Sequence, residues 1–426
     1  MPEKHSGFHE FMPEDVWKWK IIESRVEDLL ALYNYQEIRL SILQDHKVLH
    51  DGITALMQED QAQDVEDKVL SLSGPDQSIS LLSLRPEGTI SVLHHTAKLA
   101  APGDLQRLYY HGPMFRKDKQ GNPMEFYQLG IEYLGSDSVL SENEVISLGM
   151  RICKQLGLHD IYLELNSFGC QTCRRPFKAA IRTYLEEHRN ALCAHCYKVL
   201  YANPNAETGC TEPECLEVMA AAPKISEFLC PTCKKNFSKV KQIQANLAHS
   251  YKVNPAMLKN FSYYNETVFD FLLKNNGKPV MIGGGGRYDY LAERITGRKI
   301  PAVGFYLNLD TIFELMQQRK LFSRNTSPFT VYLCAQTQDM DIMLLQLASE
   351  LHDYGITTYV NPEIQDTESE RRNAAAQGAS LMLILRDENI REGKILLHNL
   401  VKEYPAYIPL NQVVGEILLA QKSLTK

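Results

Sequence analysis

The segment EFYQLGIEYLG covers residues 125–135 and predicts a β-strand, because aromatic and β-branched residues are frequent in it. Three further segments nearby also predict strands: 79–84, 105–111 and 161–166. These strands rarely alternate with short helices, so we expect an antiparallel sheet rather than a parallel one. Apolar residues at helical spacing predict helices at 14–33 and 140–156, which would flank that sheet.

Elements farther from this segment follow from the same patterns. Residues 35–43, 267–274 and 279–283 predict strands, residues 306–319 predict a helix, and the polar stretch 59–67 predicts a loop or a short helix. The composition changes between residues 167 and 250, where there is no aspartate and most of the cysteines gather. We therefore expect residues 167–250 to form a separate domain inserted into the sheet domain.

A polar linker, RKLFSRNTSP at residues 319–328, predicts another domain boundary. Beyond it, residues 329–335, 356–361 and 380–386 predict buried strands, and residues 339–354, 366–377 and 410–422 predict helices. This alternation is typical of a small α/β domain with a largely parallel sheet.

Size and charge exclude several classes of protein. The chain has 426 residues, of which 44% are hydrophobic, which is enough for about two to four domains with their own cores. Its net charge of −7 argues against tight, non-specific binding of RNA. The polar N-terminal sequence MPEKHSGFHE is unlike a signal peptide, and no apolar run approaches the ~20 residues that cross a bilayer. We expect a cytoplasmic protein with no membrane contact.

Eight of the ten cysteines form four closely spaced pairs: Cys170 with Cys173, Cys193 with Cys196, Cys210 with Cys215, and Cys230 with Cys233. Such pairs in a reducing compartment are more typical of metal binding than of disulfides. Four thiolates suit Zn²⁺, so eight cysteines predict two structural zinc sites. The spacing leaves open which pairs share an ion, and the alternative is free, buried or vestigial thiols.

Four motifs in this order resemble the histidyl-tRNA synthetase family of class II: LRPEGT (84–89) with GPMFR (112–116), QLGIEYLG (128–135), NFSYYNETVF (260–269) and VMIGGGGRYDYL (280–291). The resemblance implies an α+β fold with a class II antiparallel sheet core, a zinc-binding insertion and an α/β domain like those that bind anticodons. The expected domains are 1–166 and 251–322 for the two parts of the core, 167–250 for the insertion and 328–426 for the C-terminal domain.

The resemblance also implies a pocket for L-histidine. Glu87, Thr89 and Gln128 match family positions that hold the α-amino group. Glu132 and Tyr264 match positions that read the two imidazole nitrogens, and a carboxylate and a phenol can supply the acceptor and donor that a neutral imidazole needs. Further members of the implied pocket wall are Tyr263, Tyr288 and the glycines Gly283 to Gly286. The alternative is an inherited scaffold that holds no ligand.

The implied ATP side differs from the family pattern. Arg116 matches the arginine that holds the α-phosphate, and Lys259 stands where the family has a catalytic arginine. Lysine keeps the charge but lacks the planar fork of a guanidinium. Three positions at which the family has arginine hold Asn122, Met124 and Thr311, and the first class II motif is also altered, at Asn34 and Ser41. Binding of ATP and Mg²⁺ is therefore in doubt, although other cations in the chain could serve.

Charge also puts RNA recognition in doubt. Residues 328–426 contain 8 basic and 13 acidic side chains, and the helix that is Lys-rich in the family keeps only Arg371 and Arg372. The insertion has 11 basic and 7 acidic residues between 170 and 250, an excess that two four-thiolate zinc centres would cancel. Phosphate neutralisation drives most RNA affinity, so binding of tRNA-His is not favoured.

The sequence therefore leads to one expectation and two alternatives. The expectation is a non-catalytic, histidine-binding regulatory paralogue, with a partner enzyme of histidine metabolism. The family resemblance suggests ATP phosphoribosyltransferase as that partner, but the relative that regulates it is commonly shorter at the C-terminus, which argues against this assignment. The first alternative is an active histidine–tRNA ligase that adenylates histidine with ATP and transfers it to tRNA-His. The second is an adaptor that binds tRNA or protein. The family resemblance implies a homodimer in each case.

Overall fold

A computed structural model describes residues 7–8, 10–54, 69–73, 80–96, 104–118, 121–202, 204, 208–257, 259, 263–275, 277–323, 329–402 and 404–424. The polar stretch 59–67 and the end of the linker, 324–328, lie outside these residues. The chain divides into two compact units, Met1–Phe322 and Ser323–Lys426. None of the helices in the described ranges combines the length and apolar character that a bilayer crossing requires.

An eight-stranded sheet forms the frame of the first unit. In spatial order its strands are β1 (Gln36–Glu37), β5 (Gln106–Lys117), β6 (Pro123–Leu134), β11 (Ala302–Asn308), β10 (Lys278–Arg287), β9 (Asn265–Asn275), β7 (Ile161–Ser167) and β8 (Tyr251–Val253). Neighbours run antiparallel except at the two edges, where β1 pairs with β5 and β8 pairs with β7 in parallel. The predicted antiparallel sheet is confirmed.

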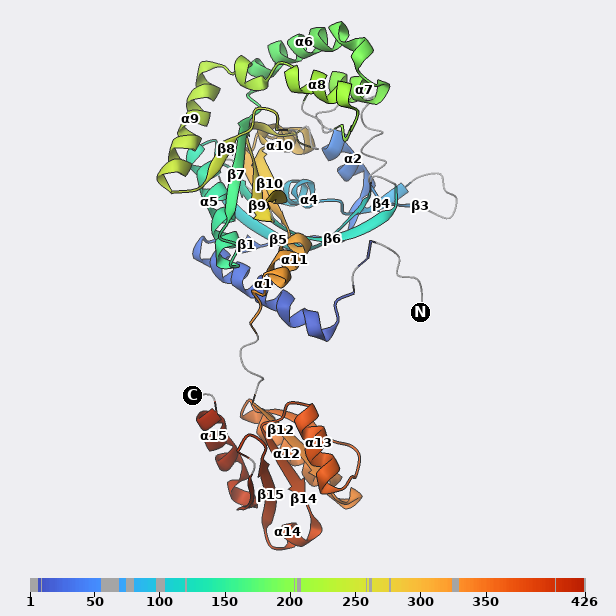
Figure 1. Cartoon of the computed structure of the whole chain (residues 1–426), viewed down its shortest axis with the longest axis vertical. Helices are drawn as coiled ribbons and strands as arrows, with labels where there is room; N and C mark the ends of the chain where they lie inside the picture. The colour runs from blue at the N-terminus through green and yellow to red at the C-terminus, as the bar shows by residue number, and fades with distance from the viewer. Residues whose placement is uncertain are drawn as a thin grey trace. The chain divides into compact units, whose positions relative to one another are not determined.

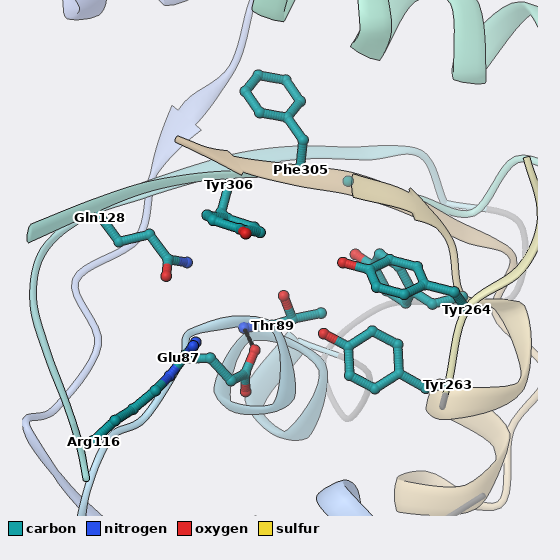
Figure 2. A pocket seen from close by; sticks show the side chains of 10 residues that line it. Glu87, Thr89, Arg116, Gln128, Tyr263, Tyr264, Phe305 and Tyr306 are labelled. Atoms are coloured by element: carbon teal, nitrogen blue, oxygen red, sulfur yellow. Dashed lines mark hydrogen bonds between the residues drawn. The ribbon is translucent and has the colours of Figure 1, made fainter. Parts of the chain in front are cut away.

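Helices and a hydrophobic core cover one face of this sheet. The helices are α1 (Pro13–Leu32), α5 (Val139–Gln155) and α11 (Leu309–Gln318). Phe271 lies at the centre, with its ring edge-on to Phe269 and Phe305 at centroid distances of 5.4 and 5.2 Å. Alternate residues of a strand point to opposite faces, so Tyr306 next to Phe305 faces the other side of the sheet (Figure 2).

The opposite face carries shorter elements. They are the helices α2 (His46–Thr54), α4 (Thr89–Thr96) and α10 (Asp289–Thr296), with a small sheet of β2 (Leu43–Asp45), β4 (Ser80–Leu84) and β3 (Ser71–Ser73). The buried residues Ile90 and Leu93 of α4 belong to a second core cluster, together with Tyr110 of the sheet. Thr89, the first residue of α4, donates to Glu132 of β6, so the N-terminal end of the helix lies against the sheet at the site described below.

The cysteine-rich segment folds into helices, which Figure 1 shows as a green group beyond α10. They are α6 (Gln171–Glu187), η2 (Arg189–Ala191), α7 (Ala194–Ala202), α8 (Pro213–Ala221), η3 (Ile225–Phe228) and α9 (Pro231–Asn246). Phe237 and Val240 of α9 belong to the core of the large sheet rather than to the rest of this group. The last helix of the segment thus packs on the core.

Three predicted elements of the first unit need correction. The strand predicted at 35–43 is not continuous: Gln36 and Glu37 form β1 and pair with β5, whereas Leu43 begins β2 and pairs with β4. Residues 302–308 form strand β11 before the helix predicted at 306–319 begins. Strand β10 continues from 283 to Arg287 through the glycine run, since these glycines pair with β9 and β11 on both sides. In each case the pairing partner lies far away in the sequence.

The second unit contains a five-stranded sheet. Its strands, in spatial order, are β13 (Thr357–Val360), β12 (Thr330–Ala335), β14 (Leu381–Leu385), β15 (Lys394–Asn399) and β16 (Tyr404–Pro409). The helices are α12 (Asp341–Asp353), α13 (Thr367–Ala376), α14 (Asp387–Arg391) and α15 (Val413–Leu424), with the short turns η4 (Gln338–Met340) and η5 (Leu410–Gln412). The three predicted strands are the parallel ones, whereas β15 and β16 add an antiparallel hairpin that the sequence patterns did not indicate.

Candidate amino-acid pocket and cysteine clusters

A pocket opens between the N-terminal end of α4 and strands β6 and β11 (Figure 2). The residues that line it are Glu87, Thr89, Arg116, Gln128, Tyr263, Tyr264, Tyr288, Gly304, Phe305 and Tyr306. Seven of the residues expected from the sequence are among them. Glu132, Lys259 and the glycines Gly283 to Gly286 were also expected, but they do not line the pocket.

Glu87 is held by the first turn of α4. Its carboxylate accepts hydrogen bonds from the backbone N–H groups of Thr89 (2.6 Å) and Ile90 (2.9 Å), which have no partner within the helix. Burial raises the pKa of Glu87, and the two backbone hydrogen bonds oppose that rise. The carboxylate is thereby fixed in one orientation, with Thr89 beside it in the lining of the pocket (Figure 2).

Glu132 lies under the wall of the pocket, opposite Gly304 of the neighbouring strand. A Cβ atom on Gly304 would come within 2.2 Å of Glu132 Oε2, so a glycine is required there. The carboxyl group accepts from Thr89 Oγ1 at 2.8 Å and from the hydroxyl of Tyr288. Burial raises the pKa of Glu132 to about 8, so Glu132 carries a proton for much of the time near neutral pH.

The side-chain amide of Gln128 has one hydrogen-bonding group that is satisfied and one that is not. Its amide nitrogen donates to the hydroxyl of Tyr110 at 3.1 Å. Its amide oxygen Oε1 is buried and accepts no hydrogen bond from any of the described groups. A buried acceptor without a donor is costly, and a bound ligand that carries N–H groups would satisfy it.

Aromatic rings form the wall that faces Glu87. The ring of Tyr263 lies 4.8 Å from that of Tyr264 and 6.0 Å from that of Tyr288, measured between centroids. All three side chains are buried. A flat, partly polar ring such as an imidazole fits between groups of this kind.

The two expected cations of the pocket have different surroundings. Arg116 lines the pocket, donates from Nε to the carbonyl of Pro86 at 2.7 Å and packs its guanidinium 4.9 Å from the ring centroid of Phe126. Lys259 is buried, and its ammonium group lies 2.5 Å from Asp270 Oδ1 and 2.9 Å from the carbonyl of Phe269. Asp270 therefore already neutralises the charge of Lys259.

The eight paired cysteines come together in two groups of four, each with its sulfur atoms within 4.8 Å of one another. Cys170, Cys173, Cys230 and Cys233 form one group, which we name the neck cluster because it brings the start of α6 next to the start of α9. Cys193, Cys196, Cys210 and Cys215 form the other, which we name the outer cluster. The structure thus settles which pairs lie together, a point that the spacing left open.

The chemistry of both clusters fits a metal ion. In a tetrahedral four-thiolate zinc site the sulfur atoms are about 3.8 Å apart, since Zn–S bonds are ~2.3 Å. Cys170 Sγ and Cys173 Sγ lie 3.6 Å apart. The backbone N–H of Cys196 donates to Cys193 Sγ at 3.3 Å, and this bond is the largest of those that lower the pKa of Cys193 to about 7. Both clusters could therefore hold a metal ion through thiolates.

Comparison with known proteins identifies the family. The model of the family described as "Histidyl-tRNA synthetase" matches residues 7–176 and 212–312, which is more than half of the chain. The chain belongs to the histidyl-tRNA synthetase family. A histidine–tRNA ligase of Halothermothrix orenii is 30% identical over 415 residues, which are 96% of this chain and 97% of that protein.

Solved structures of histidyl-tRNA synthetases have the same fold. Apo histidyl-tRNA synthetase of S. aureus is 24% identical, with a TM-score of 0.78 over 98% of this chain and 100% of the other. A Bacillus halodurans structure described as an ATP phosphoribosyltransferase regulatory subunit/histidyl-tRNA synthetase is 20% identical, with a TM-score of 0.62 over 88% and 96%. At these identities the two structures establish the fold alone.

Asn122, Met124 and Thr311, at which the sequence resemblance implied arginine in the family, each make a local contact here. Asn122 lies in the turn between β5 and β6, where its amide donates to Asp118 at 3.2 Å. Met124 packs against the second core cluster. The backbone N–H of Thr311 donates to Asn308 Oδ1 at 2.9 Å and so caps α11. Arg116 is thus the one cation among the described residues that line the pocket.

Other residues support the pocket but carry no signal in the sequence motifs that identify histidyl-tRNA synthetases here. Asp270 neutralises Lys259, and Tyr110 holds Gln128. Arg174, just after Cys173, donates to the carbonyls of Tyr264 and of Phe168. A single polar residue in a strand or helix does not reveal such a partner, because the contact depends on how distant segments pack.

Proposed function

We propose that this member of the histidyl-tRNA synthetase family binds L-histidine and acts as a regulatory, non-catalytic paralogue. The observation that carries the proposal is the contrast between the two sides of the pocket. The amino-acid side is lined by Glu87, Thr89, Gln128 and three tyrosines, and Gln128 contributes a buried acceptor without a donor among the described groups. The phosphate side has Arg116 at its edge and a lysine that Asp270 already neutralises.

Histidine suits the amino-acid side for chemical reasons. Its α-ammonium group can donate to Gln128 Oε1 and approach the fixed carboxylate of Glu87. Its imidazole can lie among the tyrosine rings, with Tyr264 and Glu132 as the hydrogen-bonding groups. A protonated Glu132 can donate a hydrogen bond as well as accept one, so it can match either tautomer of a neutral imidazole.

Adenylation demands more than this pocket offers. The attack of the carboxylate on the α-phosphate expels pyrophosphate, whose charge must be screened by fixed cations in a partly dry site. Each charge-assisted phosphate contact is worth roughly 1.5–3 kcal/mol, and about 1.4 kcal/mol changes a rate tenfold. The uncharged side chains at Asn122, Met124 and Thr311 therefore point to a rate far below that of a synthetase.

The proposed assembly follows from this role. The regulated partner would be an enzyme of histidine metabolism, and the chain itself would pair as a homodimer. Each cysteine cluster would hold one Zn²⁺ with a structural role, since four thiolates fill its coordination sphere. Elemental analysis of protein purified without added metal should give about two zinc ions per chain, and a folded, metal-free protein would contradict that assignment.

One observation favours an active histidine–tRNA ligase as the second candidate. The relatives named histidine–tRNA ligase align with this chain over nearly the full length of both proteins, so no large segment of theirs is missing here. Arg116 and Lys259 also keep two positive charges near the pocket. In this alternative, cations elsewhere in the chain would screen the departing pyrophosphate.

Two measurements on the purified chain distinguish these candidates. Calorimetry should show L-histidine binding in the micromolar to millimolar range, and Glu132→Ala should weaken it at least about tenfold, the loss expected when one buried hydrogen-bonding partner is removed. Histidine-dependent ATP–pyrophosphate exchange should be absent across a range of Mg²⁺ and ATP concentrations. Robust exchange would establish the ligase instead.

Restoring the missing cations provides the matched control. The variant with arginine at 122, 124, 259 and 311 together should recover some exchange, whereas single replacements should not, because such groups act as a unit. If histidine fails to bind even at several millimolar, the pocket is an inherited scaffold and the proposal is wrong.

A further inference from the structure

The first turn of α6 is bonded directly to the wall of the amino-acid pocket. Arg174 reaches out of the insertion and donates hydrogen bonds to the backbone carbonyls of Tyr264 and of Phe168, the latter at 3.4 Å. Arg174 follows Cys173 immediately, and Cys170 is the N-cap of α6. The position of this guanidinium therefore depends on how the neck cluster places the start of the helix.

Two backbone hydrogen bonds also connect Glu266, close to Tyr264, to the residues just before Cys170. The backbone N–H of Phe168 donates to the carbonyl of Glu266 at 2.6 Å, and the N–H of Glu266 donates to the carbonyl of Gly169 at 3.1 Å. Glu266 has φ of +48°, which is uncommon for a residue with a side chain and persists only where the surroundings enforce it. The pocket segment 263–266 is thus held by the two residues that precede Cys170.

The neck cluster joins two helix ends that the sequence separates widely. Cys170 occupies the N-cap position of α6, and Cys230 occupies that of α9. The backbone N–H of Cys230 donates to Cys173 Sγ at 3.1 Å. Since α9 packs on the core of the large sheet, a metal ion shared by these cysteines would fix the start of α6 relative to the core. Arg174 and residues 168–169 would then hold the pocket segment in place.

We propose that the metal ion of the neck cluster organises the histidine pocket, with Arg174 as the positioning residue that connects the two. The inference rests on the proposed function, because it takes the pocket to bind histidine. A filled neck cluster holds Tyr263 and Tyr264 in their binding positions, and loss of the ion releases them. The amino-acid affinity of the protein therefore depends on the zinc content of this one cluster.

The outer cluster offers an internal control with the same chemistry. Its cysteines bond to backbone and side-chain groups of the insertion itself, such as Ala191 and Thr208. No hydrogen bond described for these four sulfur atoms reaches the segment 263–266 or the N-terminal end of α4. Emptying the outer cluster should therefore leave the pocket unchanged.

The test compares matched variants of the full chain. Cys230→Ser with Cys233→Ser empties the neck cluster, and Cys210→Ser with Cys215→Ser empties the outer cluster. Each double variant should lose about one zinc ion per chain by elemental analysis, as expected for four-ligand sites. Calorimetric histidine affinity should fall at least about tenfold in the neck variant and by less than about twofold in the outer variant. Equal affinity in the neck variant, or an equal loss in both, would overturn the proposal.

Variants of Arg174 test its hydrogen bonds to the pocket segment without removing any cysteine that would bind zinc. Arg174→Gln keeps all eight cysteines, so it should retain about two zinc ions while histidine affinity falls about tenfold. Arg174→Lys retains a charged donor and should recover part of that loss. Unchanged histidine affinity in Arg174→Gln would show that Arg174 does not connect the neck cluster to the pocket. That result would also overturn the proposal.

Hydrogen–deuterium exchange gives a readout that does not depend on histidine binding. Amides of residues 263–266 should exchange faster in the neck variant than in the wild type, and at the wild-type rate in the outer variant. If the wild type binds no histidine, the proposed function fails while this exchange comparison still decides the inference. Unchanged protection of 263–266 in the neck variant would refute the coupling.

Discussion

Glu132 shows how one buried carboxyl group can set the behaviour of a pocket. It is almost fully buried, with Gly304 opposite it on the neighbouring strand and the Tyr288 hydroxyl bonded to it. Burial is the largest cause of its raised pKa, and the hydrogen bonds from Tyr288 and Thr89 offset only part of the rise. In the unliganded protein, Glu132 therefore remains protonated at a pH at which carboxyl groups are normally charged.

This preference predicts a pH-dependent stability. The pKa of Glu132 is about 8 in the folded chain and 4.5 in the ordinary, exposed state. The folded form thus binds the proton more tightly, and its stability falls as pH rises from about 4.5 through about 8. Glu132→Gln has no such proton, so its melting temperature relative to the wild type should rise across that range and level off above it. Parallel melting curves from pH 5 to 9 would contradict this account.

At the scale of secondary structure, the register of β11 against β6 decides whether the pocket can exist. Gly304 faces Glu132 across this pair, and a methyl group there would also come within 2.4 Å of the backbone oxygen of Ile131. A backbone atom cannot move aside as a flexible side chain can. The strand must therefore shift or the carboxyl group must leave its site.

Gly304→Ala should consequently destabilise the first unit by roughly 1–3 kcal/mol, the usual cost of overpacking, and should reduce histidine binding. Gly415→Ala is a suitable control, because it lies in α15 with no atom within 4 Å of the added methyl group. It should be neutral or stabilising by up to ~1 kcal/mol, the gain of alanine over glycine in a helix. Denaturant unfolding monitors both variants, and a neutral Gly304→Ala would show that the strand pair yields easily.

Elements with strong local patterns were predictable from the sequence, and those defined by distant partners were not. Helices α1 and α5 appear within a residue or two of their predicted ends, because their apolar residues repeat at helical spacing. Strand β11 and the glycine half of β10 were missed, since glycines hide a strand pattern that only pairing on both sides enforces. The pocket residues lie in family motifs and could be identified from them. Asp270 and Arg174 could not, because their roles depend on contacts with residues that are distant in the sequence.

For the whole molecule, charge predicts weak binding of tRNA. The C-terminal region 328–426 has 8 basic and 13 acidic residues, and its exposed Arg371 and Arg372 are followed by an alanine-rich stretch rather than by further cations. Few phosphates can be neutralised, so few counterions are released.

Filter binding should therefore give a dissociation constant for tRNA-His of about 10 μM or weaker at physiological salt, within the range of non-specific binding. The slope of log affinity against log salt should be shallower than that of the Halothermothrix orenii relative measured in parallel. Submicromolar binding with a steep slope would favour the ligase instead.

The neck cluster has a consequence for how such a chain can evolve. Cys170 and Cys230 lie 60 positions apart in the sequence, yet their sulfur atoms are within 4.8 Å. The segment between these cysteines therefore begins and ends at nearly the same point. A gene could lose or exchange it as a cassette, with only a short loop needed to rejoin the ends. Helix α9 lies outside the cassette and stays with the core, so descendants stripped of the outer cluster should still retain this helix.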